Sequence, residues 1–266
     1  MEVSYLAILF MVLAYLSGSL CSAIIISNAF NLPDPRSEGS KNPGATNVLR
    51  LAGKKYAGIV LFFDCFKGFL PVLIAKLVGV SPVGLSYVCF AAVFGHMFPV
   101  FYQFRGGKGI ATAMGALLAF HLMLGTMVIA TWLVVANFTR YSSAASIISM
   151  VLAPFFSVMV VNSVLIVPPF IFIALFVLFK HRNNLTRLMD GVEPKIGRTT
   201  PEGELESLEE PTPIEISQTK ESGIIKEVEV GCEAVEVPDV KEKPQEDIES
   251  AEAEEKEILD QTMKKE

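Results

Sequence analysis

The chain has 266 residues, of which 52% are hydrophobic, and a formal net charge of −6. Residues 1–200 contain 15 Lys and Arg against 6 Asp and Glu, a net charge of +9, whereas residues 201–266 contain 7 against 22, a net charge of −15. This division excludes a uniformly soluble globular chain. It predicts an apolar, basic membrane domain of residues 1–198 and an acidic, disordered tail of residues 199–266.

Six apolar runs follow one another along the first part of the chain. They cover about residues 3–29, 54–79, 83–104, 110–138, 144–160 and 163–180. A helix needs about 20 residues to cross a bilayer, so the run at 110–138 is too long for one crossing. Gly115, His121 and Gly125 interrupt it, which predicts a short helix, a turn near 120–124 and a second helix. We therefore predict an all-α membrane protein with seven transmembrane helices, one of them short.

Basic residues gather in alternate connections between these runs, and the other connections (about 80–82, 120–124 and 161–163) contain no Lys or Arg. The positive-inside rule then predicts a periplasmic N-terminus, with the glycine-rich loops and the C-terminus in the cytoplasm. The basic residues of the cytoplasmic side are Arg36, Lys41, Arg50, Lys54, Lys55, Arg105, Lys108, Arg140, Lys180, Arg182, Arg187, Lys195 and Arg198. All loops with polar chemistry are thus expected on one face.

The first polar stretch between apolar runs is Gly39–Arg50, with the sequence GSKNPGATNVLR. Pro43 suits the first position of a short helix, whose free backbone N–H groups would face an anion. The planar guanidinium of Arg50 suits bidentate phosphate recognition. A turn whose basic residues only set the topology is the alternative. The candidate substrate-binding residues here are Ser40, Asn42, Gly44, Ala45, Thr46, Asn47 and Arg50.

A second loop, Gly106–Gly109 with the sequence GGKG, precedes the apolar run that begins at Ile110. Its spacing is not that of a nucleotide P-loop. Gly106, Gly107 and Gly109 nevertheless allow close backbone approach, and Lys108 adds a point charge, as in a phosphate nest. We therefore predict a second anion-binding loop on the same face.

Several polar residues lie inside or beside the apolar runs. Asp64 and Lys67 can pair at i,i+3 spacing, either as an internal structural pair or as support for the site. His96 is interpreted as a core residue that links helices. His121 is placed at the outer turn, away from the site. The four cysteines, Cys21, Cys65, Cys89 and Cys232, lack CxxC spacing and predict neither a disulfide framework nor a metal site.

Further candidates follow the later runs. His181 is either a general base or an interfacial residue, and Asn184 lies in the same stretch. Ser143 and Ser146 open the sixth segment on the cytoplasmic face, where either can donate to a phosphate; helix capping by Ser142 or Ser143 is the alternative.

Five of these stretches resemble one family in order along residues 4–198. They are GSKNPGATNVLR from Gly39, LFFDCFKG from Leu61, GHMFPVFYQFRGGKGIAT from Gly95, HRNN from His181 and EPKIGR from Glu193. The sequence resembles the bacterial acyl-phosphate:glycerol-3-phosphate acyltransferases. It departs from them at Cys21, where the family usually has proline, and this makes the bend of the first segment uncertain in position.

The resemblance implies an enzyme of the bacterial inner membrane that transfers a fatty acyl group from acyl phosphate to the 1-hydroxyl of glycerol 3-phosphate. It implies no metal and no cofactor. The expected partners are these two substrates and membrane lipids, not nucleic acid. By motif position, the glycerol 3-phosphate binders would be Ser40, Arg50, Lys108, Ser146 and Asn184, and the acyl-phosphate head would lie between the loop at 106–109 and the turn at 42–46.

Because an acyl phosphate is already activated, positioning and charge stabilisation suffice, and no covalent enzyme intermediate is expected. The proton acceptor is a substrate phosphate or His181, and we prefer the phosphate. A transporter for phosphorylated solutes is the main rival, although transporters place polar groups near the bilayer midplane and contain internal repeats. A membrane scaffold regulated by the acidic tail is a third reading, and it leaves both loops unexplained.

Overall fold

The computed structural model describes residues 4–196, and within that range every regular element is a helix. The α-helices are α1 (Tyr5–Gly18), α2 (Ser22–Ala29), α3 (Ala45–Leu77), α4 (Pro82–Met97), α5 (Ile110–Phe120), α6 (Leu122–Thr139), α7 (Ser142–Val161), α8 (Val167–Lys180) and α9 (Arg182–Met189). Two short 3-10 helices, η1 (Val100–Tyr102) and η2 (Val164–Ile166), lie in the connections. The predicted acidic tail lies outside the described residues.

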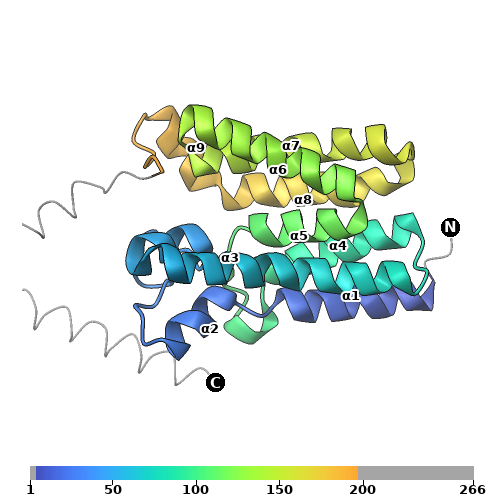
Figure 1. The fold of residues 1–266 in the computed structure, drawn as a ribbon, viewed down its shortest axis with the longest axis horizontal. Helices are drawn as coiled ribbons and strands as arrows, with labels where there is room; N and C mark the ends of the chain where they lie inside the picture. Colours follow the sequence, from blue (N-terminus) through green and yellow to red (C-terminus); the bar gives the residue numbers. More distant parts are fainter. Residues whose placement is uncertain (1–3, 197–266) are drawn as a thin grey trace, which may run out of the picture. The chain divides into compact units, whose positions relative to one another are not determined.

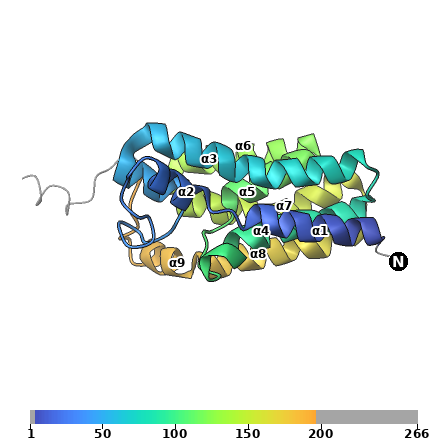
Figure 2. The ribbon, with the colours of Figure 1, turned by 90° about the horizontal axis from the view of Figure 1, so that it is seen from below.

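The long helices run side by side along a common direction, as both ribbon views show (Figures 1 and 2). The helices α2 and α9 lie at the same end of this bundle, on opposite sides of it, and α1 begins at the other end (Figure 1). The connections that contain the two glycine-bearing loops lie at the α2 and α9 end. We call it the loop end.

Five helical stretches are long and apolar enough to cross a membrane. They are Tyr5–Ala29, Ala45–Leu77, Pro82–Tyr102, Leu122–Thr139 and Ser142–Val161. The pair Val164–Lys180 and Arg182–Met189, bent by 60°, makes a sixth if it counts as one span. Helix α5 has only 11 residues. The sequence prediction of an all-helical membrane protein is therefore confirmed. Residues 4–196 contain five or six spans by length and composition, and the count of seven crossings stays a prediction.

Glycines allow the bundle to close. A Cβ atom on Gly115 of α5 would fall on the backbone carbonyl of Cys65 in α3, and one on Gly68 would fall on that of Thr112. A Cβ atom on Gly95 of α4 would likewise fall on the carbonyl of Tyr15 in α1. Small residues at helix crossings let backbones approach closely, which is a main source of helix association in membranes.

One helix boundary differs from the sequence prediction. Helix α3 begins at Ala45 rather than near residue 54, so Arg50, Lys54 and Lys55 lie on the helix and not in a connection. Gly53, with φ of 81°, interrupts the helix at this point, and only glycine adopts such a backbone angle readily. The amphipathic turns before Gly53 contain polar residues, and the apolar run begins just after it. The hydropathy pattern therefore marked where the apolar run begins and not where the helix begins.

Two internal breaks divide the apolar runs, and the sequence predicted the one near 120–124. The long run divides at His121, between α5 and α6. The first segment breaks between Gly18 and Ser22, even though Cys21 occupies the position of the family's proline. The carbonyl of Leu20, which no helix satisfies there, accepts a hydrogen bond of 2.6 Å from Lys67 Nζ.

Candidate functional site

A chain of polar contacts at the loop end joins four side chains. Lys108 Nζ donates to Asn184 Oδ1 at 2.6 Å, and Asn184 Nδ2 donates to Glu193 Oε1 at 2.7 Å. The other carboxylate oxygen of Glu193 accepts from Arg187 Nε at 2.8 Å. Glu193 therefore fixes which way the Asn184 amide faces, and this leaves the amide oxygen toward Lys108. A cation held by an oriented amide is suited to binding a phosphate.

The charge states of Lys108 and Glu193 in these polar contacts follow from their surroundings. Burial lowers the pKa of Lys108 to about 8, although the nearby Glu193 carboxylate opposes this shift. Burial also raises the pKa of Glu193, but hydrogen bonds and the Arg187 guanidinium outweigh it and hold that pKa below its usual value. At neutral pH the site thus contains a carboxylate and a partly desolvated ammonium. Such an ammonium attracts an anion more strongly than a fully hydrated one does.

His181 lies between α8 and α9 and is 2% exposed. Its Nδ1 donates to the backbone carbonyl of Val177 at 2.9 Å. This contact assigns the proton of the neutral ring to Nδ1 and leaves Nε2 as an acceptor. Burial and the nearby Lys108 charge lower the pKa of His181 to about 4. The imidazole is therefore neutral at physiological pH and is a weak base.

Asn47 organises the first loop instead of facing a ligand. It is 1% exposed, its Oδ1 accepts from the Ser40 backbone N–H at 2.8 Å, and its Nδ2 donates to the carbonyls of Pro35 and Glu38 at 3.0 Å each. Its amide is thus occupied by the loop backbone. The side chains of Ser40, Thr46 and Arg50 are exposed. Asn47 holds the loop that carries Ser40 in place.

The turn of this loop contains a strained residue. Lys41 has φ of 54°, in the left-handed region that L-residues seldom adopt. Gly44 is the N-cap of α3, so the helix begins one residue after it at Ala45 and not at Pro43. The backbone N–H groups of the first turn of α3 belong to Ala45, Thr46 and Asn47. Residues in such conformations cluster at ligand sites, where the surrounding structure fixes them.

The glycine loop packs directly against the end of α4. A Cβ atom on Gly106 would fall on the carbonyl of His96, and one on Gly107 would fall on His96 Nε2. The latter would also lie 3.0 Å from the carbonyl of Pro43. The two polar loops therefore meet at Gly107 and Pro43. Gly109, with φ of 81°, is the N-cap of α5, so the loop leads straight into a helix N-terminus.

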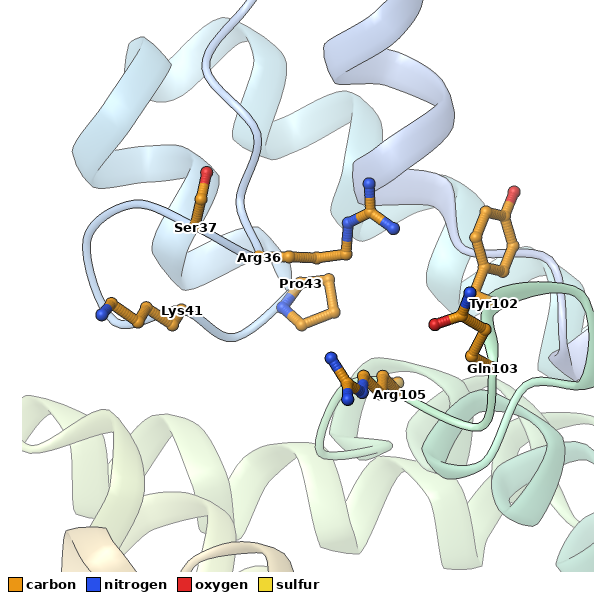
Figure 3. A pocket seen from close by; sticks show the side chains of 8 residues that line it. Arg36, Ser37, Lys41, Pro43, Tyr102, Gln103 and Arg105 are labelled. Atoms are coloured by element: carbon orange, nitrogen blue, oxygen red, sulfur yellow. The ribbon is translucent and has the colours of Figure 1, made fainter. Parts of the chain in front are cut away.

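A cavity of about 330 Å³ opens between the two loops. Figure 3 shows the side chains of Arg36 and Arg105 on either side of it, with Lys41 at one edge and Tyr102 at the other. Pro43 and Gly106 complete its wall, together with Ser37 and Gln103. Arg36 is paired with Asp34 at 2.7 Å, whereas Lys41 and Arg105 form no ion pair within the described residues, and these two cations make the cavity a favourable place for an anionic group.

The two serines of α7 differ in how their hydroxyls are used. Ser146 Oγ donates to the Ser142 carbonyl at 2.7 Å and accepts from Trp132 Nε1 at 3.1 Å. Ser143 is buried beside Glu193 and has no well-aligned hydrogen-bond partner. Of the two, Ser143 has the less engaged hydroxyl, which lies buried beside the Glu193 carboxylate, whereas the resemblance pointed to Ser146.

The structure therefore brings Lys108, Asn184 and His181 together at one place. Arg50 lies close enough to lower the pKa of Lys108. Two residues had no assigned part in the sequence-based site. Glu193 was visible only as the first residue of EPKIGR, and His96 was interpreted as a core residue. Both are polar residues beside glycine or proline, a pattern that is too common to identify them without the fold.

Taken together, these features define a class: a helical membrane protein with a cluster of cations, amides and glycines, suited to an anion such as phosphate, at one end of its bundle. Comparison with known proteins agrees. A family model described as glycerol-3-phosphate acyltransferase matches residues 8–191. A glycerol-3-phosphate acyltransferase of Legionella pneumophila (strain Corby) is 59% identical over 191 residues, which cover 72% of this chain and 69% of the relative. A glycerol-3-phosphate acyltransferase of Pseudoalteromonas translucida is 48% identical over 192 residues, which cover 72% of this chain and 94% of the relative.

The structural comparison points the same way. The crystal structure of PlsY (YgiH), an integral membrane glycerol 3-phosphate acyltransferase, in its glycerol 3-phosphate form, superposes with a TM-score of 0.68. It is 38% identical and covers 76% of this chain and 98% of its own. Its lysophosphatidic acid form superposes with a TM-score of 0.65 and is 37% identical in sequence. The chain belongs to the glycerol-3-phosphate acyltransferase family, and the expected acyltransferase class is confirmed.

Proposed function

We propose that this protein transfers a fatty acyl group from acyl phosphate to the 1-hydroxyl of glycerol 3-phosphate, giving lysophosphatidic acid and inorganic phosphate. The observation that carries this is the meeting of two cation-bearing loops at Gly107 and Pro43. Lys108 of the same glycine loop is held by Asn184 of α9, and a cavity lined by Lys41 and Arg105, together with the Asp34-paired Arg36, lies between the two loops. A reaction between two phosphorylated substrates needs two anion-binding places side by side, and the loop end offers both.

Lys108, Asn184 and Arg50 are the proposed binders of the acceptor's phosphate, with Ser143 or Ser146 as a hydroxyl donor. Ammonium, guanidinium and amide groups suit phosphate oxygens, and Arg50 can bind two of them at once. Glu193 has no free oxygen toward the ligand because its two oxygens accept from Asn184 and Arg187. It therefore acts through Asn184 and not on the substrate itself.

The donor's phosphate is proposed to lie against the backbone of the glycine loop and the turn at 42–46, facing the cavity lined by Arg36, Lys41 and Arg105. Backbone N–H groups at the N-termini of α3 and α5 face such an anion favourably. The acyl chain of the donor would extend along the apolar helices toward the bilayer. The phosphate end of the donor and the 1-hydroxyl of the acceptor then meet near Gly107.

In the reaction, the 1-hydroxyl oxygen of glycerol 3-phosphate attacks the acyl carbonyl carbon and forms the new ester bond. The bond between that carbon and the phosphate oxygen breaks, and the phosphate leaves with the electron pair. The hydroxyl proton ends on a phosphate oxygen. A pKa of about 4 makes His181 a poor proton acceptor, and this supports the substrate phosphate in that role. Positioning and cations at the developing charge supply the catalysis.

The proposed setting is the bacterial inner membrane, with seven crossings in which the 11-residue α5 is the short one. The N-terminus would be periplasmic and the loop end cytoplasmic. The basic residues at the loop end support this orientation. So does α5, which begins directly after the glycine loop. Residues 199–266 would then be a cytoplasmic tail, outside the described part of the chain.

The site assignment is tested by comparing two lysine variants in detergent with palmitoyl phosphate and glycerol 3-phosphate. Lys108→Met is expected to lower kcat/KM for glycerol 3-phosphate by about a hundredfold, because it removes a charged hydrogen bond that is partly shielded from water. The exposed Lys54, also on the basic side, provides the control, and Lys54→Met should retain wild-type kinetics. Equal activity of the two variants would contradict the proposed site.

A further inference from the structure

The residue of interest is His96, which lies at the last turn of α4 directly under the glycine loop. Its side chain is only 5% exposed, and its Nδ1 lies 3.6 Å from Asp64 Oδ1. The opposite edge of the ring, at Nε2, occupies the place where a side chain on Gly107 would begin. The imidazole therefore fills the space between a carboxylate inside the bundle and the backbone of the loop.

The carboxylate of Asp64 is itself fixed. Lys67 Nζ lies 2.7 Å from Asp64 Oδ1, and the side chains are only 6% and 3% exposed for Lys67 and Asp64. The same ammonium donates to the carbonyl of Leu20, at the break between α1 and α2, at 2.6 Å. Charged groups at such a depth are costly, and in membrane proteins they usually mark functional sites. Here the pair anchors α3 to the broken first segment and presents one oxygen to His96.

The loop follows the outline of His96 closely. Gly106 abuts its backbone carbonyl and Gly107 abuts its ring, so side chains are excluded at both positions. On the far side, Gly107 abuts the Pro43 carbonyl. Lys180 Nζ donates to the carbonyl of Met97 at 2.7 Å and secures the same end of α4 from α8. The position of the loop backbone is thus set by His96 on one side and by the Pro43 turn on the other.

We propose that His96, held by the buried Asp64–Lys67 pair, is a positioning residue that sets the glycine loop in the place where it receives the phosphate of the acyl donor. This inference rests on the proposed function, in which that loop binds the donor. His96 acts through the loop backbone and does not take part in proton transfer. Lys108, a proposed acceptor binder, lies in the same loop, but its side chain is held from α9 by Asn184 and not by His96.

If His96 positions the loop, its removal should raise KM for the acyl donor and leave KM for the acceptor nearly unchanged. His96→Ala is expected to raise KM for palmitoyl phosphate by about tenfold, a change typical of one lost buried contact, with KM for glycerol 3-phosphate changed less than about twofold. Asp64→Asn should give the same split in weaker form. His96→Gln, whose amide can reach the position of Nε2, should restore most of the donor affinity. His121→Ala changes a histidine at the other end of the bundle and serves as the control.

A double-variant cycle tests the contact itself. Gly107→Ala places a methyl group on His96 Nε2 and should weaken donor use strongly. In the His96→Ala background the same methyl group has room, so the double variant should be no worse than Gly107→Ala alone. Contacting residues show such non-additivity, whereas distant ones do not. Gly58→Ala is the matched control, since a Cβ atom there meets nothing within 4 Å.

The outcomes distinguish a wrong donor from a wrong role of His96. Absence of phosphate release from palmitoyl phosphate by the wild-type protein would overturn the proposed donor, and the cycle would then be read from thermal unfolding midpoints in detergent. Penalties that multiply in the double variant, or equal rises in both KM values, would overturn the role of His96. If His96→Ala does not yield a monodisperse protein, His96→Gln and Asp64→Asn are compared, and wild-type donor KM in Asp64→Asn contradicts the proposal.

Discussion

The protonation of Lys108 gives the sharpest prediction of how this site responds to its surroundings. Its pKa is lowered to about 8 because burial disfavours the ammonium form. With that pKa, about 90% of the side chain is charged near pH 7 and only about 10% near pH 9. Only the ammonium form attracts the acceptor's phosphate. We therefore expect kcat/KM for glycerol 3-phosphate to fall about tenfold between these two pH values, since this parameter reports groups of the free enzyme.

The assay measures initial rates with palmitoyl phosphate from about pH 6 to about pH 10, with non-enzymatic hydrolysis subtracted at each pH. In Lys108→Arg the alkaline fall should move above the measured range, because a guanidinium remains charged there. In Glu193→Gln the fall should move to lower pH, because the Glu193 carboxylate raises the pKa of Lys108. A flat wild-type profile to about pH 10, or an unchanged fall in Lys108→Arg, would refute the assignment.

Three further predictions concern the site and the bundle. Asn184→Ala should lower kcat/KM by about ten- to a hundredfold in steady-state assays, since it removes two hydrogen bonds to charged partners, while Asn183→Ala, at an exposed neighbour, should not. His181→Gln should retain turnover within about tenfold; abolished turnover with glycerol 3-phosphate binding intact would make the histidine the base. Gly115→Ala should destabilise the protein by about 1–3 kcal/mol, seen as a lower unfolding midpoint in detergent than for Gly58→Ala.

The sequence predicted the fold where long apolar runs were separated by glycines or polar residues. The apolar runs located the membrane helices, and His121 with its neighbouring glycines located the break between α5 and α6. The start of α3 at Ala45 could not be read from hydropathy, because its first turns are polar and precede the kink at Gly53. The number of crossings stays a prediction, since the 11-residue α5 is shorter than the roughly 20 residues that a helix usually needs to cross a bilayer.

The candidate site was predictable in its residue types but not in its contacts. The two loops could be recognised because each combines glycines with basic residues between apolar segments. The Lys108–Asn184 contact joins residues 76 positions apart, and such a separation follows only from the fold. Asn47 looked like a ligand donor, yet its amide holds the loop backbone. Glu193 orients the Asn184 amide, and His96 lies against the glycine loop. Both contacts follow from the fold and could not be predicted from the sequence.

The central claim is that acyl phosphate is the donor and glycerol 3-phosphate the acceptor. The most direct test incubates the purified protein in detergent with glycerol 3-phosphate and either palmitoyl phosphate or palmitoyl-CoA, and quantifies lysophosphatidic acid and released phosphate. We predict that palmitoyl phosphate gives both products in equal amounts, with the acyl group on the 1-hydroxyl, and that palmitoyl-CoA gives none. Transfer from palmitoyl-CoA, or no product from palmitoyl phosphate, would contradict the account.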